Sequence, residues 1–175
     1  MANLVIESSP PPSSWNVEKS YRGITNYHNN LMGIRKSAMN DLRTHLNFTQ
    51  IRFHCSKQQG RTFHVTTVAN STGEAVVQYF SDQTEVLPFA CNSFKRLDGD
   101  NSQLAVQCHQ WGKDGSHYVG KWGQINHQGE KKMYNNAAFI SYKYYWHIYQ
   151  GVWLCDDVGN KTVVSQGDFW KIYVR

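Results

Sequence analysis

The sequence predicts an α+β, mainly β fold: an N-terminal helical segment followed by an antiparallel β-sandwich or barrel. Three observations support this prediction. Before residue 47, apolar residues recur every three or four positions, as on one face of a helix. From Asn47 they alternate with a period of two, which is typical of half-buried strands. Turn residues then recur at intervals of about ten, as in antiparallel all-β folds.

The organisation along the chain follows from these patterns. Residues 1–15 contain Pro10, Pro11 and Pro12 among serines and predict a flexible leader. Residues 16–175 predict a single domain, in keeping with a length of 175 residues. Within it, residues 16–46 form the helical segment, one helix or two joined near Asn29, and residues 47–175 form the β-rich body.

The β-rich body begins with a predicted hairpin, because two alternating runs, 47–55 and 61–68, flank a turn ending in Gly60. The next turn is predicted at Asn70–Gly73. The remaining runs rich in β-branched and aromatic residues predict further strands at 74–80, 102–109, 117–122, 132–141, 144–149, 152–155, 161–164 and 169–174.

The composition narrows the range of ligands that the protein is expected to bind. Aromatic residues reach 14% but charged residues only 18%, and the chain holds 14 Asn and 12 Gln. A surface of amides and aromatics favours a neutral polyhydroxyl ligand over a polyanion. The net charge of +5 is scattered, without a run of five basic residues. We therefore expect weak attraction to anionic membranes and no specific nucleic-acid partner.

The four cysteines stand at positions 55, 91, 108 and 155 without C-x-x-C spacing, so no structural metal is expected. The N-terminus lacks the features of a signal peptide. This predicts four reduced thiols in the cytoplasm, with one or two disulfides as the alternative if the chain is exported without a recognisable signal. The sequence lacks a phosphate-binding loop and a dinucleotide fingerprint, so no cofactor is expected.

The first candidate site is the segment between Trp111 and Trp122. It carries Asp114 and His117 among glycines and short polar residues. An aromatic face suits the C–H face of a sugar ring, and fixed polar groups suit its hydroxyls. The alternative is that both tryptophans are core residues on either side of a turn.

The second candidate site gathers acidic residues at two predicted strand ends, Asp156 with Asp157 and Asp168 with Trp170. Paired carboxylates could accept sugar hydroxyls, bind calcium or act as the acid and base of a glycosidase. The alternative is that these aspartates only form turns.

The aromatic run 142–149 predicts a strand buried on both faces, with a membrane-interface belt or a stacking platform as functional alternatives. Together these observations predict a lectin-like protein that recognises neutral glycans or glycoconjugates without catalysis. A membrane-active, cytolysin-like lipid-binding protein and a small hydrolase of polysaccharide or RNA are the alternatives. The sequence leaves open whether the chain forms a homo-oligomer.

Overall fold

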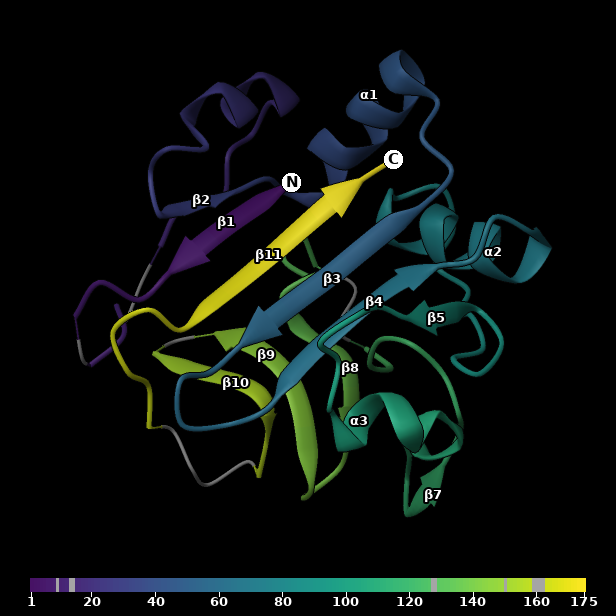
Figure 1. Cartoon of the computed structure of the whole chain (residues 1–175). Helices are drawn as coiled ribbons and strands as arrows, with labels where there is room; N and C mark the ends of the chain where they lie inside the picture. Colours follow the sequence, from purple (N-terminus) through teal and green to yellow (C-terminus); the bar gives the residue numbers. More distant parts are fainter. Residues whose placement is uncertain (9, 13–14, 127–128, 150, 159–162) are drawn as a thin grey trace.

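The computed structural model describes residues 1–8, 10–12, 15–126, 129–149, 151–158 and 163–175. Its largest element is a six-stranded antiparallel sheet with the order β2-β1-β11-β3-β4-β5 (Figure 1). Its strands are β1 (Ala2–Val5), β2 (Leu31–Gly33), β3 (Ile51–Ser56), β4 (Thr62–Thr67), β5 (Phe94–Arg96) and β11 (Phe169–Val174).

A second antiparallel sheet has three strands in the order β10-β9-β8, and a separate two-stranded hairpin pairs β6 with β7. These strands are β6 (Lys113–Asp114), β7 (His117–Tyr118), β8 (Asn135–Ile140), β9 (Tyr144–Tyr149) and β10 (Val152–Asp157). The helices are η1 (Tyr21–Asn26), α1 (Lys36–Leu46), α2 (Ser71–Phe80), α3 (Gln103–Val106) and η2 (Cys108–Gln110).

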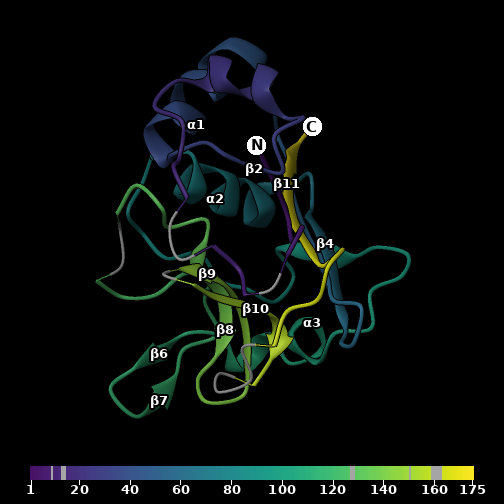
Figure 2. The same cartoon turned by 90° about the vertical axis from the view of Figure 1, so that its left-hand side faces the viewer.

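The core lies on one face of the six-stranded sheet, the inner face. Helices α1 and α2 and the three-stranded sheet all lie on this side (Figures 1 and 2). The ring of Phe53 in β3 shows the packing, because its centroid is 5.3 Å from that of Phe80 in α2 and 5.2 Å from that of Trp146 in β9. The mainly β, antiparallel prediction is confirmed. Because helices share the inner face with the second sheet, a sandwich or barrel is not confirmed.

The N-terminal part differs most from its prediction. The structure begins with a strand rather than a helix, because β1 pairs with both β11 and β2 and buries Ala2 and Leu4. The predicted flexible leader thus contains an inner strand of the main sheet. The predicted helical segment 16–46 is helical only in η1 and α1, with β2 between them. A four-residue strand is too short for its alternation to stand out in the sequence.

Two predicted strands are helices. Residues 74–80 belong to α2, whose first backbone N–H groups, at Thr72 and Gly73, donate to the side chain of Asn70. A side chain at position 73 is excluded, because a Cβ there would lie 1.9 Å from the oxygen of Val68. Residues 102–109 form α3 and the start of η2, and Ser102 caps α3 by accepting from the N–H of Ala105 at 3.2 Å.

The other predicted strands fare better. The hairpin of β3 and β4 is confirmed, as are the strands β9, β10 and β11. The expectation that the run 142–149 is buried on both faces is wrong, because only Trp146 and Ile148 of β9 are buried. Only residues 117–118 of the predicted strand 117–122 form a strand, and β8 covers part of 132–141. Residues 161–162 of the predicted strand 161–164 lie outside the described residues.

Candidate functional site

The two tryptophans of the first predicted site are core residues. Trp111 and Trp122 are both fully buried, with ring centroids 4.7 Å apart in an edge-to-face contact. The indole N–H of Trp111 donates to the carbonyl oxygen of Leu104 at 2.7 Å, and that of Trp122 donates to Oγ of Ser93 at 2.8 Å. Burial therefore excludes both rings as stacking platforms for a sugar, and the expectation that one of them presents a face is corrected.

The segment between the tryptophans reaches the surface as the β6–β7 hairpin. Asp114 pairs with His117 across the hairpin, and Lys113 pairs with Tyr118. Asp114, His117 and Tyr118 are exposed. Gly115 takes the left-handed conformation that this tight turn needs, with φ +56°. The structure thus keeps Asp114 and His117 together on an exposed tip, held from below by the buried tryptophans.

A third aromatic residue stands beside this hairpin. Tyr142 lies in the turn between β8 and β9 and has 79% of its surface exposed. The ammonium nitrogen of Lys113 lies 4.9 Å from the centroid of its ring, which is a cation–π contact from the hairpin to this turn. We call Lys113, Asp114, His117, Tyr118 and Tyr142 the hairpin-tip site.

The backbone of Tyr142 is unusual. Its φ of 65° lies in the left-handed region, where bulky side chains are uncommon. The backbone N–H of Tyr142 donates to the phenol oxygen of Tyr145 at 2.8 Å, which helps to hold the turn. A left-handed residue with a large exposed side chain is a reason to form a hypothesis of function at this position.

Sequence reasoning assigned Tyr142 to a strand and so missed it. The turn Ser141–Lys143 contains none of the glycine, proline, asparagine or aspartate residues that signal a turn. The break between the predicted strands 132–141 and 144–149 indicated a turn here, but the interpretation of the run 142–149 as one buried strand hid the exposed ring.

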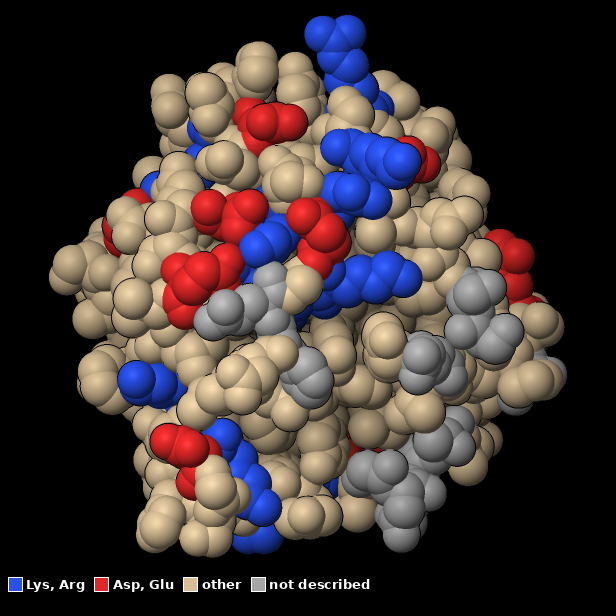
Figure 3. Space-filling view, turned by 180° about the vertical axis from the view of Figure 1, so that it is seen from behind, with Lys and Arg blue, Asp and Glu red and all other residues tan. Residues whose placement is uncertain are grey.

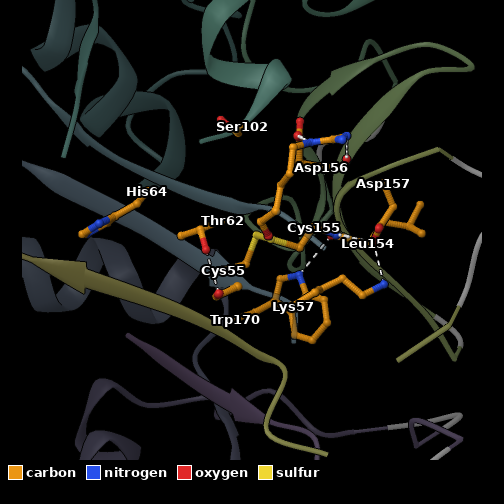
Figure 4. Close-up of a disulfide and its surroundings, with 12 residues drawn as sticks. Cys55, Lys57, Thr62, His64, Ser102, Leu154, Cys155, Asp156, Asp157 and Trp170 are labelled. Carbon is orange, nitrogen blue, oxygen red and sulfur yellow. Dashed lines mark hydrogen bonds and ion pairs between the residues drawn. A yellow bond between two sulfur atoms is a disulfide. The ribbon is translucent and has the colours of Figure 1, made fainter. Parts of the chain in front are cut away.

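The acidic residues of the second predicted site are built into the fold around a disulfide (Figure 4). The pairing of β10 with β9 is irregular between Cys155 and Asp157, and Asp156 there has φ 57°. Such a bulge turns neighbouring side chains towards different partners. Asp156 and Asp157 accordingly contact different parts of the molecule and do not form a carboxylate pair facing a ligand.

Asp156 anchors α3. Its carboxylate forms an ion pair with Arg61 and accepts from the backbone N–H groups of Gln103 at 2.9 Å and Leu104 at 2.7 Å. Because the α3 N-terminus carries free N–H groups, a carboxylate is well placed there. Burial raises the pKa of Asp156, while Arg61 and the two N–H groups oppose that shift. The three donors that contact this carboxylate all belong to the fold.

The other residues of this predicted site, Asp157, Asp168 and Trp170, also have partners within the fold. Asp157 accepts from Nζ of the buried Lys57 at 2.7 Å. Asp168 is 1% exposed and accepts from the backbone N–H of Gln58 at 2.7 Å. Trp170 is fully buried, and its indole N–H donates to the Leu154 oxygen at 3.0 Å. Asp156, Asp157, Asp168 and Trp170 are thus structural and stand apart from the hairpin-tip site.

The cysteines are paired, which corrects the prediction of reduced thiols. Cys55 in β3 is bonded to Cys155 in β10, and Cys91 is bonded to Cys108 in η2. The first bond joins the two sheets across 100 residues of chain, a pairing that sequence spacing alone does not specify. Among the described residues, no group of three His, Cys, Asp or Glu side chains is placed to hold a metal ion.

Comparison with known proteins gives no relative for this chain. No family model, no curated protein and no solved structure matches it. In the part of the chain that the structure describes, no helix has both the length and the apolar character needed to cross a bilayer. A functional proposal therefore depends on the geometry of the site.

Proposed function

We propose that this chain is a lectin-like protein that binds neutral glycans through the hairpin-tip site, without catalysis. The observation that carries the proposal is the ring of Tyr142, which is held exposed by a left-handed backbone next to the β6–β7 hairpin. A tyrosine ring offers an apolar face to the C–H face of a sugar and a hydroxyl at its rim. Its two side-chain torsions make it a rigid contact of low entropic cost.

The hairpin supplies the polar partners that a sugar needs. The carboxylate of Asp114 can accept from hydroxyl groups, and the imidazole of His117 can donate or accept. Both are exposed, and they face each other across the hairpin, whose base is fixed by the buried Trp111 and Trp122. A rigid scaffold under exposed polar groups favours ligand binding, because little conformational entropy of the hairpin is lost when the ligand binds.

The disulfides indicate the kind of compartment in which the proposed binding takes place. Paired cysteines form and persist in oxidising compartments, and they are rare in the cytosol. We therefore favour export over the cytoplasm as the setting for the proposed glycan recognition.

A second candidate function uses the same residues. Tyr142 and Tyr118 are exposed beside Lys113 and Lys143. Tyrosine and lysine together are typical of surfaces that contact the headgroup region of anionic membranes. This arrangement favours peripheral lipid binding as the alternative to glycan binding.

The deciding experiment screens the purified protein on an array of neutral glycans and on vesicles with and without phosphatidylserine. We expect binding to a defined set of glycans. Tyr142→Ala should weaken it by roughly 5- to 150-fold, the range expected for the loss of an aromatic anchor. The matched control is Tyr149→Ala, which removes a partly exposed tyrosine from the other end of β9.

Three results would contradict the proposal. They are the absence of glycan binding by the unaltered protein, full binding by folded Tyr142→Ala, and an equal loss in Tyr149→Ala. Binding to anionic vesicles alone, lost with Tyr142→Ala, would support the lipid alternative instead.

A further inference from the structure

A pocket of about 350 Å³ opens on the outer face of the six-stranded sheet, the face away from α1 and α2. Its lining includes Arg52, Thr66, Lys95, Leu97 and Tyr173. This pocket lies near the C-terminal end of β11, whereas the β6–β7 hairpin lies at the opposite end of the molecule (Figure 1). It is thus separate from the hairpin-tip site.

The sheet register aligns the polar groups of this pocket in one row. Tyr173 in β11 pairs with Arg52 in β3, Arg52 pairs with Thr66 in β4, and Thr66 pairs with Lys95 in β5. Paired residues project their side chains from the same face of a sheet. Arg52 and Lys95 are therefore two strands apart, about 10 Å, with a hydroxyl group between them.

The cations of this row have no acidic partner. Among the described residues, neither Arg52 nor Lys95 forms an ion pair. The loop after β5 holds two acids: Asp98, which is exposed, and Asp100, which is bound to Arg96 at 2.7 Å. The back of the molecule is different, because lysines and arginines there lie next to carboxylates (Figure 3). In this row, Arg52 and Lys95 thus carry positive charges that no ion pair between described residues neutralises.

Arg52 contacts the ring of Tyr173 and keeps one donor without a partner among the described residues. Its guanidinium carbon lies 4.9 Å from the centroid of the Tyr173 ring, which is a cation–π contact. Its Nε is buried and has no hydrogen-bond partner. A buried N–H without a partner is costly, so an acceptor that enters the pocket gains a prepared donor.

The neighbouring row adds to the positive field. Lys171 pairs with His54, and His54 pairs with His64, whose ring stacks on it with centroids 3.9 Å apart. Burial, followed by the charges of His64, Arg52 and Lys171, lowers the pKa of His54 to about 4. With this pKa, His54 is neutral at pH 7, and Lys171 is the residue of this pair that adds positive charge.

We propose that this pocket binds a tetrahedral oxyanion of the phosphate or sulfate class. The planar guanidinium of Arg52 can donate two parallel hydrogen bonds to such a group, Lys95 supplies a point charge, and Thr66 donates a hydroxyl. A pocket of about 350 Å³ also has room for a small organic group that carries the anion. The site is independent of the proposed glycan binding.

The test is calorimetric titration with inorganic phosphate and with inorganic sulfate, at an ionic strength held constant with sodium chloride. We expect saturable binding to the unaltered protein. Arg52→Gln and Lys95→Gln should each weaken it about ten- to hundredfold, since each removes a charged donor. Lys95 is exposed, so its variant should fold even if Arg52→Gln does not.

The matched control is Lys19→Gln, which removes an exposed lysine far from the pocket lining and should leave binding unchanged. Tyr142→Ala should also leave phosphate binding unchanged, so the two proposals can fail separately. A sugar phosphate and a sulfated disaccharide then distinguish the sources of the anion. The proposal is overturned by the lack of saturable binding above the chloride baseline, or by unchanged affinity in Lys95→Gln. It is also overturned if a single-stranded oligonucleotide binds while neither inorganic anion does.

Discussion

The hairpin-tip site and the surroundings of the Cys55–Cys155 disulfide contain the same kinds of side chains in opposite circumstances. At the tip, Asp114 is exposed and Lys113 lies over an exposed ring. Around the disulfide, Asp156 is 1% exposed and bound by three donors, and the ammonium group of Lys57 contacts a carboxylate. Residue type alone therefore does not distinguish a binding surface from a structural network.

The distinction lies in whether the polar groups already have partners. A carboxylate whose oxygens accept from the chain has little capacity left for a ligand, and removing it leaves buried groups unpaired. An exposed carboxylate on a rigid hairpin has capacity and costs little to change. The comparison thus predicts large effects on stability in the disulfide region and large effects on binding at the tip.

The largest effect on stability should come from the disulfide between the sheets. Cys55→Ala with Cys155→Ala should lower the free energy of unfolding by about 4.7 kcal/mol, because about 100 residues of the unfolded chain lose a constraint. The matched double variant at Cys91 and Cys108, 17 residues apart, should lose about 3 kcal/mol. Urea unfolding of the oxidised proteins measures both. A smaller loss at the first pair than at the second would contradict the expectation.

The next effect concerns the base of the hairpin. Trp111 is close to the tip in sequence, but its side chain is a core residue. Its ring is fully buried and stacks on that of Phe94, with centroids 5.1 Å apart. Trp111→Ala should destabilise the fold by about 3–5 kcal/mol. Thermal unfolding monitored by circular dichroism measures this. A loss below about 1 kcal/mol would mean that this ring is not a core residue in solution.

Asp156 and Asp114 give the most direct comparison of the two regions. Asp156→Asn should cost about 3 kcal/mol, because it leaves the Arg61 guanidinium without its counter-charge while keeping a residue that tolerates positive φ. Asp114→Asn should change stability by less than about 0.5 kcal/mol. Urea unfolding of the two variants checks both values, and equal losses would break the distinction between the regions.

Much of the fold could be predicted from the sequence, and the failures have physical causes. The alternation in β3 and the aromatic run of β11 gave correct strands, because one face of each is buried and the pattern is long enough to read. The run 74–80 was misassigned since β-branched residues favour strands, whereas the Asn70 cap and the packing of Val76 and Phe80 on the core stabilise a helix. In this segment, tertiary contacts outweigh the local preference for a strand.

The candidate site was only partly predictable. The structure keeps Asp114 and His117 of the segment 111–122 on an exposed hairpin, but its tryptophans are buried, and the functional proposal uses Tyr142 in their place. That tyrosine comes from a turn about 25 residues further along, so its proximity to Lys113 is a property of the packing. The row of Tyr173, Arg52, Thr66 and Lys95 was equally hidden, because strand order determines it.

The smallest expected effect tests the observation on which the functional proposal rests. Tyr142→Gly and Tyr142→Ala both remove the ring, so both should lose glycan binding to the same extent. They should differ in stability, because alanine keeps the Cβ that opposes a φ of 65°, whereas glycine does not. We expect Tyr142→Gly to be more stable than Tyr142→Ala by about 1 kcal/mol in urea unfolding. Equal stability of the two variants would show that residue 142 is not held in the left-handed conformation in solution.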